Sequence, residues 1–341
     1  MSAGRTIGLA HGAGGRAMRE LIETLFVAAA DDMEIDGTGV AAMDDGAAIF
    51  VEDRWLVMTT DTHVVQPLFF PGGDIGRLAV SGTVNDLAAM GATEVLGLSC
   101  AFVIEEGFPR ADLERIHASM RAACIEAHAP IITGDTRVMG HRQLDGLIVN
   151  TTGIAFASRV VTDAGLAPGD RLIVTGTVGD HGLTVLATRC GIAGLDGLRS
   201  DVAPIGSLVR AALEAGGEDV VAMKDPTRGG VASALGEMAR KAGVGIQLDA
   251  TAVPVSSPAR AAAELLGIDP MHLSSQGRMV LGVRPMSADR VLAALRAHPR
   301  GAGATLLGAA TAGHVGQVVV EDGFERRVLG ELDGDPVARE C

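Results

Sequence analysis

The sequence lacks tyrosine and contains one tryptophan and eight phenylalanines among its 341 residues. So few rings cannot build a base-stacking surface or an aromatic sugar-binding platform. Basic residues are also scarce: 28 lysines and arginines stand against 42 acidic residues, which gives a net charge of −14. Because binding to a phosphate backbone requires clustered basic residues, the composition argues against nucleic acid as a partner.

Cysteines are few and widely spaced, and long apolar runs are missing. The four cysteines form no CxxC pair, which argues against a zinc knuckle or a redox pair. Although 48% of the residues are hydrophobic, no stretch reaches the roughly 18 apolar residues that a membrane helix needs. Residues 1–15 lack the basic start and apolar core of a secretory signal. We therefore expect a cytoplasmic protein that does not span a membrane.

The length and the pattern along the chain predict two domains. At about 150 residues per domain, 341 residues suffice for two units with real cores. Helix-like and strand-like patterns alternate in both halves, which indicates an α+β or mixed α/β fold. We place the boundary near residue 158, ahead of a turn signal at 167–170. The prediction is a domain over 1–158, a second over 159–330, and a polar, mobile tail over 331–341.

The predicted elements follow from hydrophobic periodicity and turn signals. Helices are expected at 16–30, 74–91, 110–127, 180–190, 201–215, 229–242, 258–266 and 287–297. Strands are expected at 47–51, 55–60, 95–104, 130–133, 146–157, 220–224, 244–249, 278–283 and 315–320.

Aspartates stand where apolar runs of the first half begin or end. Asp44 and Asp45 precede the run at 47–51, Asp61 follows the run at 55–60, Asp86 lies in a predicted helix, and Asp135 follows 131–134. Hard oxygen ligands suit Mg²⁺, which bridges carboxylates to substrate phosphates. Together with a glycine-rich stretch at 11–15, the pattern predicts a magnesium-nucleotide site. The alternative for each aspartate is a turn-capping role.

Two further segments have functional and structural interpretations. Residues 225–230 (DPTRGG) join a predicted strand to a helix, where backbone N–H groups can hold an anion or where Asp225 or Thr227 simply caps the helix. His181 in the stretch GDHG either contacts a ligand in a cleft or makes a structural hydrogen bond. For His11, the position in a glycine-rich loop favours a substrate or nucleotide contact over core packing.

The order of these motifs is more specific than any one of them. They are LAHGAGG at 9–15, TDT at 60–62, PLFFPGG at 67–73, GTVND at 82–86, ITGDT at 132–136, GTVGDHG at 176–182, DPTRGG at 225–230 and a terminal Cys341. Together they resemble the family of the hydrogenase maturation factor HypE. That family shares a superfamily with aminoimidazole ribonucleotide synthetase, selenophosphate synthetase and thiamine-monophosphate kinase.

The resemblance implies a fold and a reaction. The implied fold is that of aminoimidazole ribonucleotide synthetase, with a mainly antiparallel N-terminal sheet used in dimerisation, a C-terminal α/β domain and a flexible tail. The implied partner HypF loads a carbamoyl group onto the C-terminal thiol. ATP then phosphorylates the amide oxygen, and loss of phosphate leaves a thiocyanate. The cyanide passes to iron held by HypC and HypD, for nickel-iron hydrogenase.

The resemblance also implies roles for individual residues, with ATP and Mg²⁺ as cofactors. The implied metal-phosphate carboxylates are Asp45, Asp61, Asp86 and Asp225. The implied nucleotide contacts are His11, Gly14, Gly15, Asp44, Asn85, Asp135 and Thr136. The implied catalytic residues are Cys341, Arg137, Gln276 and His181.

Three positions depart from the family pattern. Arg137 replaces a usual lysine, Gln276 replaces a usual glutamate, and the tail ends VAREC instead of PRIC. Arg137 keeps a phosphate donor but holds its proton, and Gln276 cannot act as a general base. A water, Asp135 or His181 would then have to accept the amide proton.

Two other functions stay open. One is a small-molecule kinase or synthetase of the same superfamily, for which Cys341 is incidental. The other is a nucleotide-binding assembly factor that has lost the dehydration step.

Overall fold

The computed structural model describes residues 6–12, 15–28, 35–192, 194–323, 325–330, 332, 337 and 339. The α-helices are α1 (Gly15–Leu21), α2 (Ile75–Ala89), α3 (Arg110–Ala127), α4 (Asp180–Arg189), α5 (Gly206–Gly216), α6 (Gly230–Ala242), α7 (Ser257–Leu266) and α8 (Pro285–Ala297). The strands are β1 (Gly37–Thr38), β2 (Ala47–Val51), β3 (Arg54–His63), β4 (Phe69–Phe70), β5 (Gly73–Asp74), β6 (Glu94–Glu105), β7 (Ile131–Met139), β8 (Leu147–Ala157), β9 (Arg171–Val174), β10 (Val220–Lys224), β11 (Gly245–Asp249), β12 (Val280–Val283), β13 (Thr305–Thr311), β14 (Val318–Glu321) and β15 (Arg326–Val328). A π-helical segment, η2 (Ile22–Val27), continues α1.

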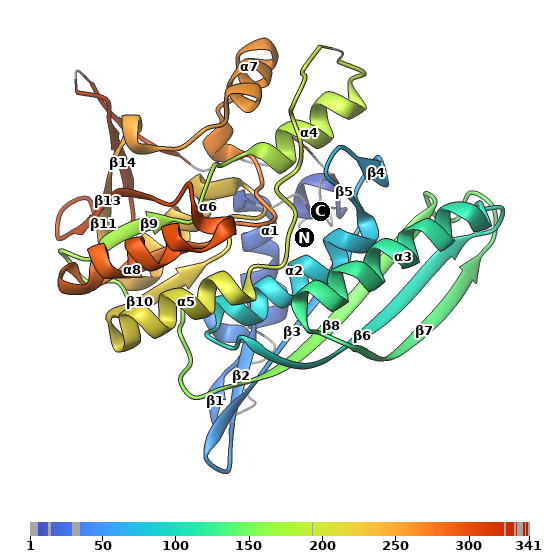
Figure 1. Cartoon of the computed structure of the whole chain (residues 1–341), viewed down its shortest axis with the longest axis horizontal. Coiled ribbons are helices and arrows are strands. Elements are labelled where there is room, and N and C mark those ends of the chain that lie inside the picture. The colour runs from blue at the N-terminus through green and yellow to red at the C-terminus, as the bar shows by residue number, and fades with distance from the viewer. Residues whose placement is uncertain are drawn as a thin grey trace, which may run out of the picture.

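The first half of the chain builds a six-stranded sheet in the order β1-β2-β3-β8-β6-β7. All neighbours are antiparallel except β6 and β7. Buried and half-buried residues alternate along β8, which is typical of a sheet with one covered face. The helices α2 and α3 lie side by side over that face (Figure 1). The predicted antiparallel character of the N-terminal sheet is confirmed.

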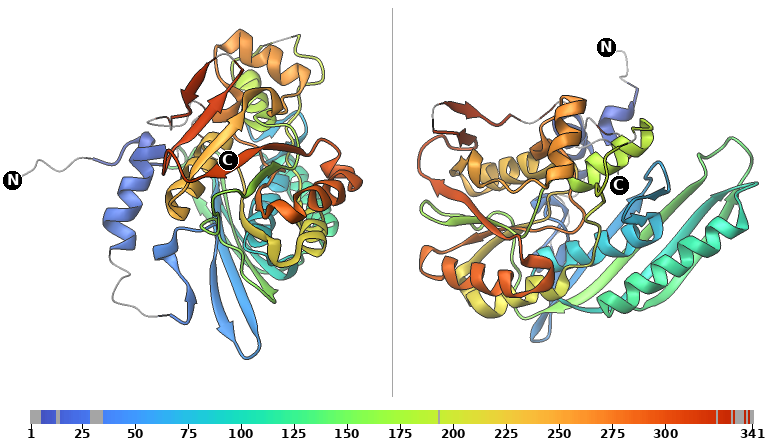
Figure 2. Two further views of the ribbon diagram at one scale, coloured as in Figure 1. Left: turned by 90° about the vertical axis from the view of Figure 1, so that its left-hand side faces the viewer. Right: turned by 45° about the horizontal axis from the view of Figure 1, so that its top comes forward.

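The sheet's edge strand β7 is unusual because each of its nine residues is exposed. On the strands beside it, the face turned away from α2 and α3 carries half-buried aliphatic and polar side chains, among them Ile148, Thr152 and Ile154. The segment α1–η2 buries no residue and stands clear of both sheets (Figure 2, left). None of the helices in the described ranges is both long enough and apolar enough to span a bilayer.

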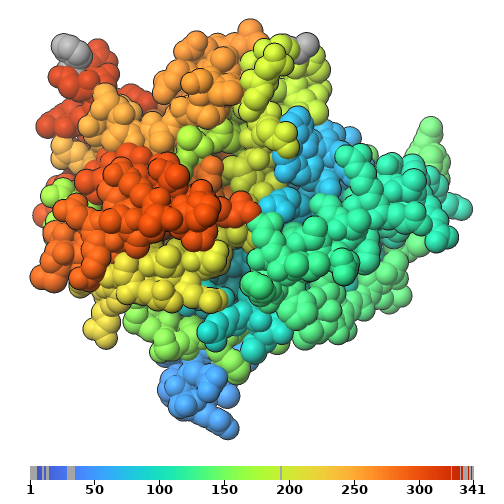
Figure 3. Space-filling view, viewed as in Figure 1, coloured from blue at the N-terminus to red at the C-terminus, as the bar shows by residue number. Residues whose placement is uncertain are grey.

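The second half builds a seven-stranded sheet in the order β10-β12-β9-β13-β11-β14-β15. The helices α5 and α8 pack on one face, and α6 packs on the other. The atoms of the two halves lie directly against each other in Figure 3, and helix α2 of the first half contacts α5 of the second. The result is the predicted mixed α/β architecture of two sheet-containing units.

The elements follow the predictions with several differences. The short strands β1, β4, β5 and β15 were not predicted, and β7 extends to Met139 instead of ending at 133. The helix expected at 16–30 is α1 followed by a π-helix to Val27, and residues 29 and 30 lie outside the described residues. Helix α5 begins at Gly206 instead of 201, because Pro204 has no N–H and disfavours a helical residue before it. Strand β13 was not predicted, since its sequence TLLGAAT is poor in the β-branched and aromatic residues that mark strands.

Candidate functional site

A cavity of about 1070 Å³ lies where the two halves meet. Its walls come from α1–η2, the segment 39–49, strand β3, the middle of α2, the turn after β10 and one side of α6. The cavity therefore draws residues from both domains, and a ligand in it would contact both.

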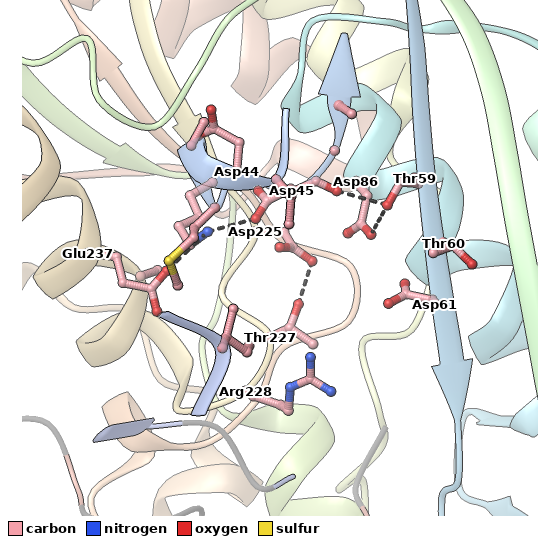
Figure 4. Close-up of a pocket in the computed structure, with 18 of the residues that line it drawn as sticks. Asp44, Asp45, Thr59, Thr60, Asp61, Asp86, Asp225, Thr227, Arg228 and Glu237 are labelled. Atoms are coloured by element: carbon pink, nitrogen blue, oxygen red, sulfur yellow. Dashed lines mark hydrogen bonds and ion pairs between the residues drawn. The ribbon is translucent and has the colours of Figure 1, made fainter. Parts of the chain in front are cut away.

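Four carboxylates that the sequence predicts as metal-phosphate ligands line this cavity. They are Asp45, Asp61, Asp86 and Asp225. Figure 4 shows them around one space, Asp61 from β3, Asp86 from α2 and Asp225 from the end of β10. The structure thus brings together four side chains that are up to 180 residues apart in sequence.

Burial and crowding raise the pKa values of Asp45, Asp86 and Asp225. Burial, reinforced by the charges of Asp61, Asp225 and Asp45, raises the pKa of Asp86 well above its usual range. Burial and the charge of Asp45 raise the pKa of Asp225 to about 7. The Thr59 hydroxyl donates to Asp86 Oδ2 at 3.0 Å. Such a cluster is electrostatically unfavourable without a cation, and a cation would relieve the repulsion.

Lys224 is the buried cation beside this cluster. Its Nζ lies 2.7 Å from Asp45 Oδ1, 3.2 Å from Glu237 Oε2 and 3.4 Å from Asp163 Oδ2. Burial disfavours the charged ammonium, but these carboxylates outweigh burial and raise the pKa of Lys224. Lys224 therefore stays charged and fixes the position of Asp45.

A second lysine, Lys241 of α6, holds the segment that carries Asp44. Its Nζ lies 2.8 Å from Asp163 Oδ2 and 2.6 Å from the Met43 carbonyl oxygen. Burial and the hydrogen bond to Asp44 raise the pKa of Asp163 to about 6. Asp44 lines the cavity, but its carboxylate also accepts from the Asp163 N–H at 3.2 Å, so it supports the loop beneath the carboxylate cluster.

The turn between β10 and α6 presents polar groups to the cavity. The Thr227 hydroxyl donates to the Asp225 carboxylate, and Arg228 turns its guanidinium toward the same space (Figure 4). Gly230 begins α6 with φ +61°, and a Cβ there would lie 2.5 Å from the Leu273 carbonyl oxygen, so only glycine fits. This close approach fixes the start of α6 beside the cavity, which Thr227, Arg228 and Ser233 line on either side of Gly230; the N-terminus of a helix favours an anion nearby.

His63 and Asp61 lie against α2 at Gly82. A Cβ on Gly82 would meet His63 Cε1 at 2.9 Å and Asp61 Oδ2 at 3.2 Å, which explains the glycine. His63 Nε2 is 3.9 Å from Asp61 Oδ2 and has no hydrogen-bond partner among the described residues. Burial lowers the pKa of His63 despite the neighbouring charge of Asp61, so the imidazole is neutral at pH 7.

Gln276 lines the cavity, whereas Asn85, which the resemblance implies as a nucleotide contact, does not. The Gln276 side chain is buried, and within the described part of the chain its Nε2 has no hydrogen-bond partner. Asn85 instead joins the domains: Nδ2 donates to the carbonyl oxygens of Ala203 and Gln276 at 3.0 and 3.1 Å, and Oδ1 accepts from the Ile205 N–H at 2.8 Å. Asn85 thus positions the backbone of Gln276.

Of the remaining predicted site residues that the structure describes, only Gly15 lines the cavity. His11 does not line it, and its Nδ1 accepts from the Gly8 N–H at 3.0 Å. His181 is fully buried, with Nδ1 2.7 Å from Ser200 Oγ. Asp135, Thr136 and Arg137 are exposed on β7, and Arg137 pairs with Asp135 at 3.4 Å. Gly14 and Cys341 lie outside the described residues.

Several residues of the cavity were missed from sequence. Lys224, Arg228, Glu237 and Lys241 supply its charges. A signal was present, since Ser233, Glu237 and Lys241 recur every four residues along α6 and therefore share one face of the helix.

The arrangement is suited to a phosphorylated ligand with a divalent cation. Within the described ranges, no three acidic, histidine or cysteine side chains form a ready-made metal cage. Mg²⁺ is usually held by one or two carboxylates together with substrate phosphates and water. Separated carboxylates beside arginines and a helix N-terminus fit that mode of binding.

The comparisons with known proteins agree with this arrangement. Residues 43–157 match the family described as AIR synthase related protein, N-terminal domain, and residues 167–321 match its C-terminal domain. The chain is therefore a two-domain protein of the AIR synthase related class.

Within this class, similar proteins with more specific names are HypE proteins. The chain is 45% identical over 340 residues to a carbamoyl dehydratase HypE of Rhizobium leguminosarum bv. viciae, covering 98% of this chain and 95% of that protein. It is 37% identical to a chain in a crystal structure of a HypE–HypF complex, with a TM-score of 0.85, covering 92% of this chain and 99% of that one. It is also 37% identical to a HypE solved in complex with ATP, with a TM-score of 0.81, covering 98% and 100% of the chains. The chain belongs to the HypE carbamoyl dehydratase family of hydrogenase maturation proteins.

Proposed function

We propose that the chain dehydrates a carbamoyl group carried on its own Cys341, with ATP as the dehydrating agent. The observation that carries the proposal is the cavity with four converging aspartates and Arg228 at the start of α6, in a chain of the HypE family. The HypE that was solved with ATP supports nucleotide binding in such a cavity. ATP-dependent chemistry of this kind belongs in the cytoplasm.

The reaction converts the S-carboxamide of Cys341 to an S-cyanate. The amide oxygen attacks the γ-phosphorus and ADP leaves. The amide nitrogen then gives up its two protons while the C–O bond breaks, which releases phosphate and leaves a C≡N group on sulfur. Phosphorylation is needed because the oxygen of a free amide is a poor leaving group, and cationic donors stabilise the charge that develops.

Magnesium belongs to this proposal as the cation that the carboxylates hold with the phosphates. Asp45, Asp61, Asp86 and Asp225 are the candidate ligands. Burial, together with repulsion between neighbouring carboxylates, raises the pKa values of Asp45, Asp86 and Asp225, and a cation would remove that repulsion. When bound, Mg²⁺ would neutralise phosphate charge. Arg228 and the N-terminus of α6 would orient the same phosphates.

The proposed partners are a HypF-type carbamoyltransferase, a HypC and HypD scaffold that receives the cyanide, and a second copy of this chain. The HypE–HypF complex supports the first. The exposed edge strand β7 and the uncovered face of its sheet support the homodimer.

The dimer would also give roles to three predicted residues that are outside the cavity. Asp61 is opposite Thr151, Thr151 opposite Cys100, and Cys100 opposite Gly134 across four strands. At about 4.8 Å per strand, Asp135 and its neighbours therefore lie about 14 Å from β3. We infer that Asp135, Thr136 and Arg137 act on the nucleotide site of the second copy.

Intact-protein mass spectrometry tests the proposed reaction. The chain is incubated with the carbamoyltransferase, carbamoyl phosphate and Mg-ATP, beside Cys341→Ala. A gain of one carbamoyl group followed by loss of one water, both absent from Cys341→Ala, is expected. No carbamoyl gain would favour an enzyme that acts on a free substrate.

Gln276→Glu separates the remaining alternatives in the same assay. A carboxylate at this buried position would accept the amide proton, so a gain of about tenfold or more in water loss is expected if the native chain lacks a strong base. If the wild type retains carbamoyl without losing water and Gln276→Glu restores the loss, the chain is an impaired assembly factor. If the wild type already loses water and Gln276→Glu does not speed this step, another group accepts the proton.

A further inference from the structure

The cavity wall at Gln276 comes from a segment without regular secondary structure. This Gln276 segment, residues 274–278, lies between a short 3-10 helix (Pro270–His272) and β12. The Gln276 side chain is buried, and its Nε2 has no hydrogen-bond partner in the part of the chain that the structure describes. An unpartnered buried amide at a cavity is a donor for a ligand, and it serves a reaction only if its backbone is held in one place.

Asp201 holds the backbone of this segment at its centre. One carboxylate oxygen, Oδ1, accepts from the Gln276 N–H at 3.1 Å, and the other, Oδ2, accepts from the Gly277 N–H at 3.3 Å. A Cβ on Gly277 would lie 2.1 Å from the Asp201 carbonyl oxygen, so only glycine lets the two backbones approach this closely. The carboxylate thus bridges two consecutive N–H groups, which fixes the direction in which the Gln276 side chain leaves the backbone.

Arg278 supplies the charge opposite Asp201. Its Nε lies 3.5 Å from Asp201 Oδ2, and the Asp201 side chain is 2% exposed. The same Nε donates to the Thr177 carbonyl oxygen at 2.9 Å, and Nη1 donates to the Gly277 carbonyl oxygen at 3.1 Å. Burial raises the pKa of Asp201, whereas Arg278 and the N–H groups of Gln276 and Gly277 oppose this rise and favour the carboxylate. The site therefore requires two acceptor oxygens, because every group that faces them is a donor.

The segment that carries Asp201 is held by the first domain. On one side of Asp201, the Ser200 N–H donates to the Pro71 carbonyl oxygen at 2.9 Å. On the other side, the Val202 carbonyl oxygen accepts from Arg77 Nε at 2.9 Å. Pro71 lies between β4 and β5, and Arg77 lies on α2. The Asp201 carboxylate therefore links the cavity wall of the second domain to the body of the first.

We propose that Asp201 is a positioning residue for the reaction: it holds the N–H groups of Gln276 and Gly277 and so fixes the Gln276 amide at the cavity, with Arg278 as its counter-charge. Asp201 does not line the cavity itself, so it acts through Gln276. The inference rests on the proposed function only for the reaction that Gln276 serves, since the contacts around Asp201 need no ligand.

Hydrogen exchange tests these contacts without any catalysis. In Asp201→Asn, one of the N–H groups of Gln276 and Gly277 faces an amide donor instead of an oxygen, so exchange there should be about three- to tenfold faster than in the wild type. The Met279 N–H, which donates to Thr175 Oγ1 at 2.9 Å, should keep its rate because the change is local. Unchanged exchange at 276 and 277 would show that Asp201 does not hold the segment.

Asp170→Asn is the matched control. Asp170 is as buried as Asp201, its Oδ2 accepts from the Ala167 N–H at 2.7 Å, and it pairs with Arg284 at 2.9 Å. It precedes β9 at the end of that strand that is remote from the Gln276 segment, because β9 and β12 are antiparallel. The control should lose comparable stability in urea denaturation and leave both exchange at 276 and 277 and the rate of water loss unchanged.

A double-mutant cycle separates positioning from a merely structural role. With the carbamoyltransferase, carbamoyl phosphate and Mg-ATP, Asp201→Asn should slow water loss about fivefold or more when Gln276 is present. In the Gln276→Ala background the same change should slow it less than about twofold, because no amide is left to position. Equal slowing in both backgrounds would overturn the positioning role, and so would water loss in Gln276→Ala as fast as in the wild type.

Failure of the proposed function would give a different result. If the wild type never loses water, the proposed function fails, and the positioning role in dehydration fails with it. Exchange at 276 and 277 would still decide whether Asp201 holds the Gln276 segment, because these two N–H groups report the contact without substrate.

Discussion

At the scale of single residues, Asp225 couples the site to pH. Its pKa in the folded, metal-free chain is about 7, because of burial and the charge of Asp45, whereas an ordinary aspartate has a pKa of about 3.9. Between about pH 4 and pH 7 the folded state therefore keeps a proton that the unfolded state has lost. The stability of the metal-free protein should fall as pH rises through this window, by at most about 1.4 kcal/mol per pH unit for this group.

Asp225→Asn removes this titration and nearly preserves the shape of the side chain. Between pH 5 and pH 7, the melting temperature of the variant should fall less than that of the wild type, measured by thermal denaturation without metal. Mg-ATP should reverse the trend in the wild type, because a cation binds the deprotonated carboxylates. Equal pH slopes in variant and wild type would contradict the assignment of this proton to Asp225.

At the scale of elements, the proposed homodimer depends on the uncovered face of the first sheet. Ile154 lies half-buried on that face of the central strand β8, opposite Met58 of β3. Ile154→Asp should convert a dimer into a 34.8 kDa monomer, because a desolvated carboxylate in an apolar interface has no partner. Light scattering after size exclusion measures the mass. Leu265→Asp is the control, since Leu265 is 64% exposed on α7, and it should leave the dimer intact. A dimer that persists in Ile154→Asp would rule out this face.

The elements also show what the sequence could predict. The hairpin β2–β3 and helices α2, α3 and α6 followed from periodicity and from polar residues at their ends, and the aspartates at strand ends pointed to the cavity. Local signals cannot specify which strands become neighbours, so the sequence grouped Asp135 with Asp61 although β8 and β6 lie between their strands. The partners of Lys224 could not be predicted for the same reason, since Asp45 is 179 residues away in sequence.

At the scale of the whole molecule, the cavity exists only while the two domains keep their relative position. Asn85 is central to that position, because its one side chain satisfies three backbone groups of the second domain, at Ala203, Ile205 and Gln276. It is 2% exposed, so water cannot replace these hydrogen bonds. A role in joining the domains therefore predicts a stability effect, whereas the nucleotide contact expected from sequence predicts an effect on ATP affinity alone.

Asn85→Ala distinguishes these two roles. The Gln276 carbonyl oxygen keeps a hydrogen bond from the Ala203 N–H at 3.4 Å, but the variant loses all three bonds of the Asn85 side chain. This loss should lower the free energy of unfolding by about 3–5 kcal/mol, measured by urea denaturation without nucleotide. Asn150→Ala is the matched control, because Asn150 bonds only within the first domain, to Asp61 and its neighbours at its surface, and it should cost about 1 kcal/mol. If Asn85→Ala is as stable as the control and binds ATP weakly, Asn85 is a nucleotide contact; a large loss of stability instead shows that it sets the geometry in which Gln276 and the four aspartates face one ligand.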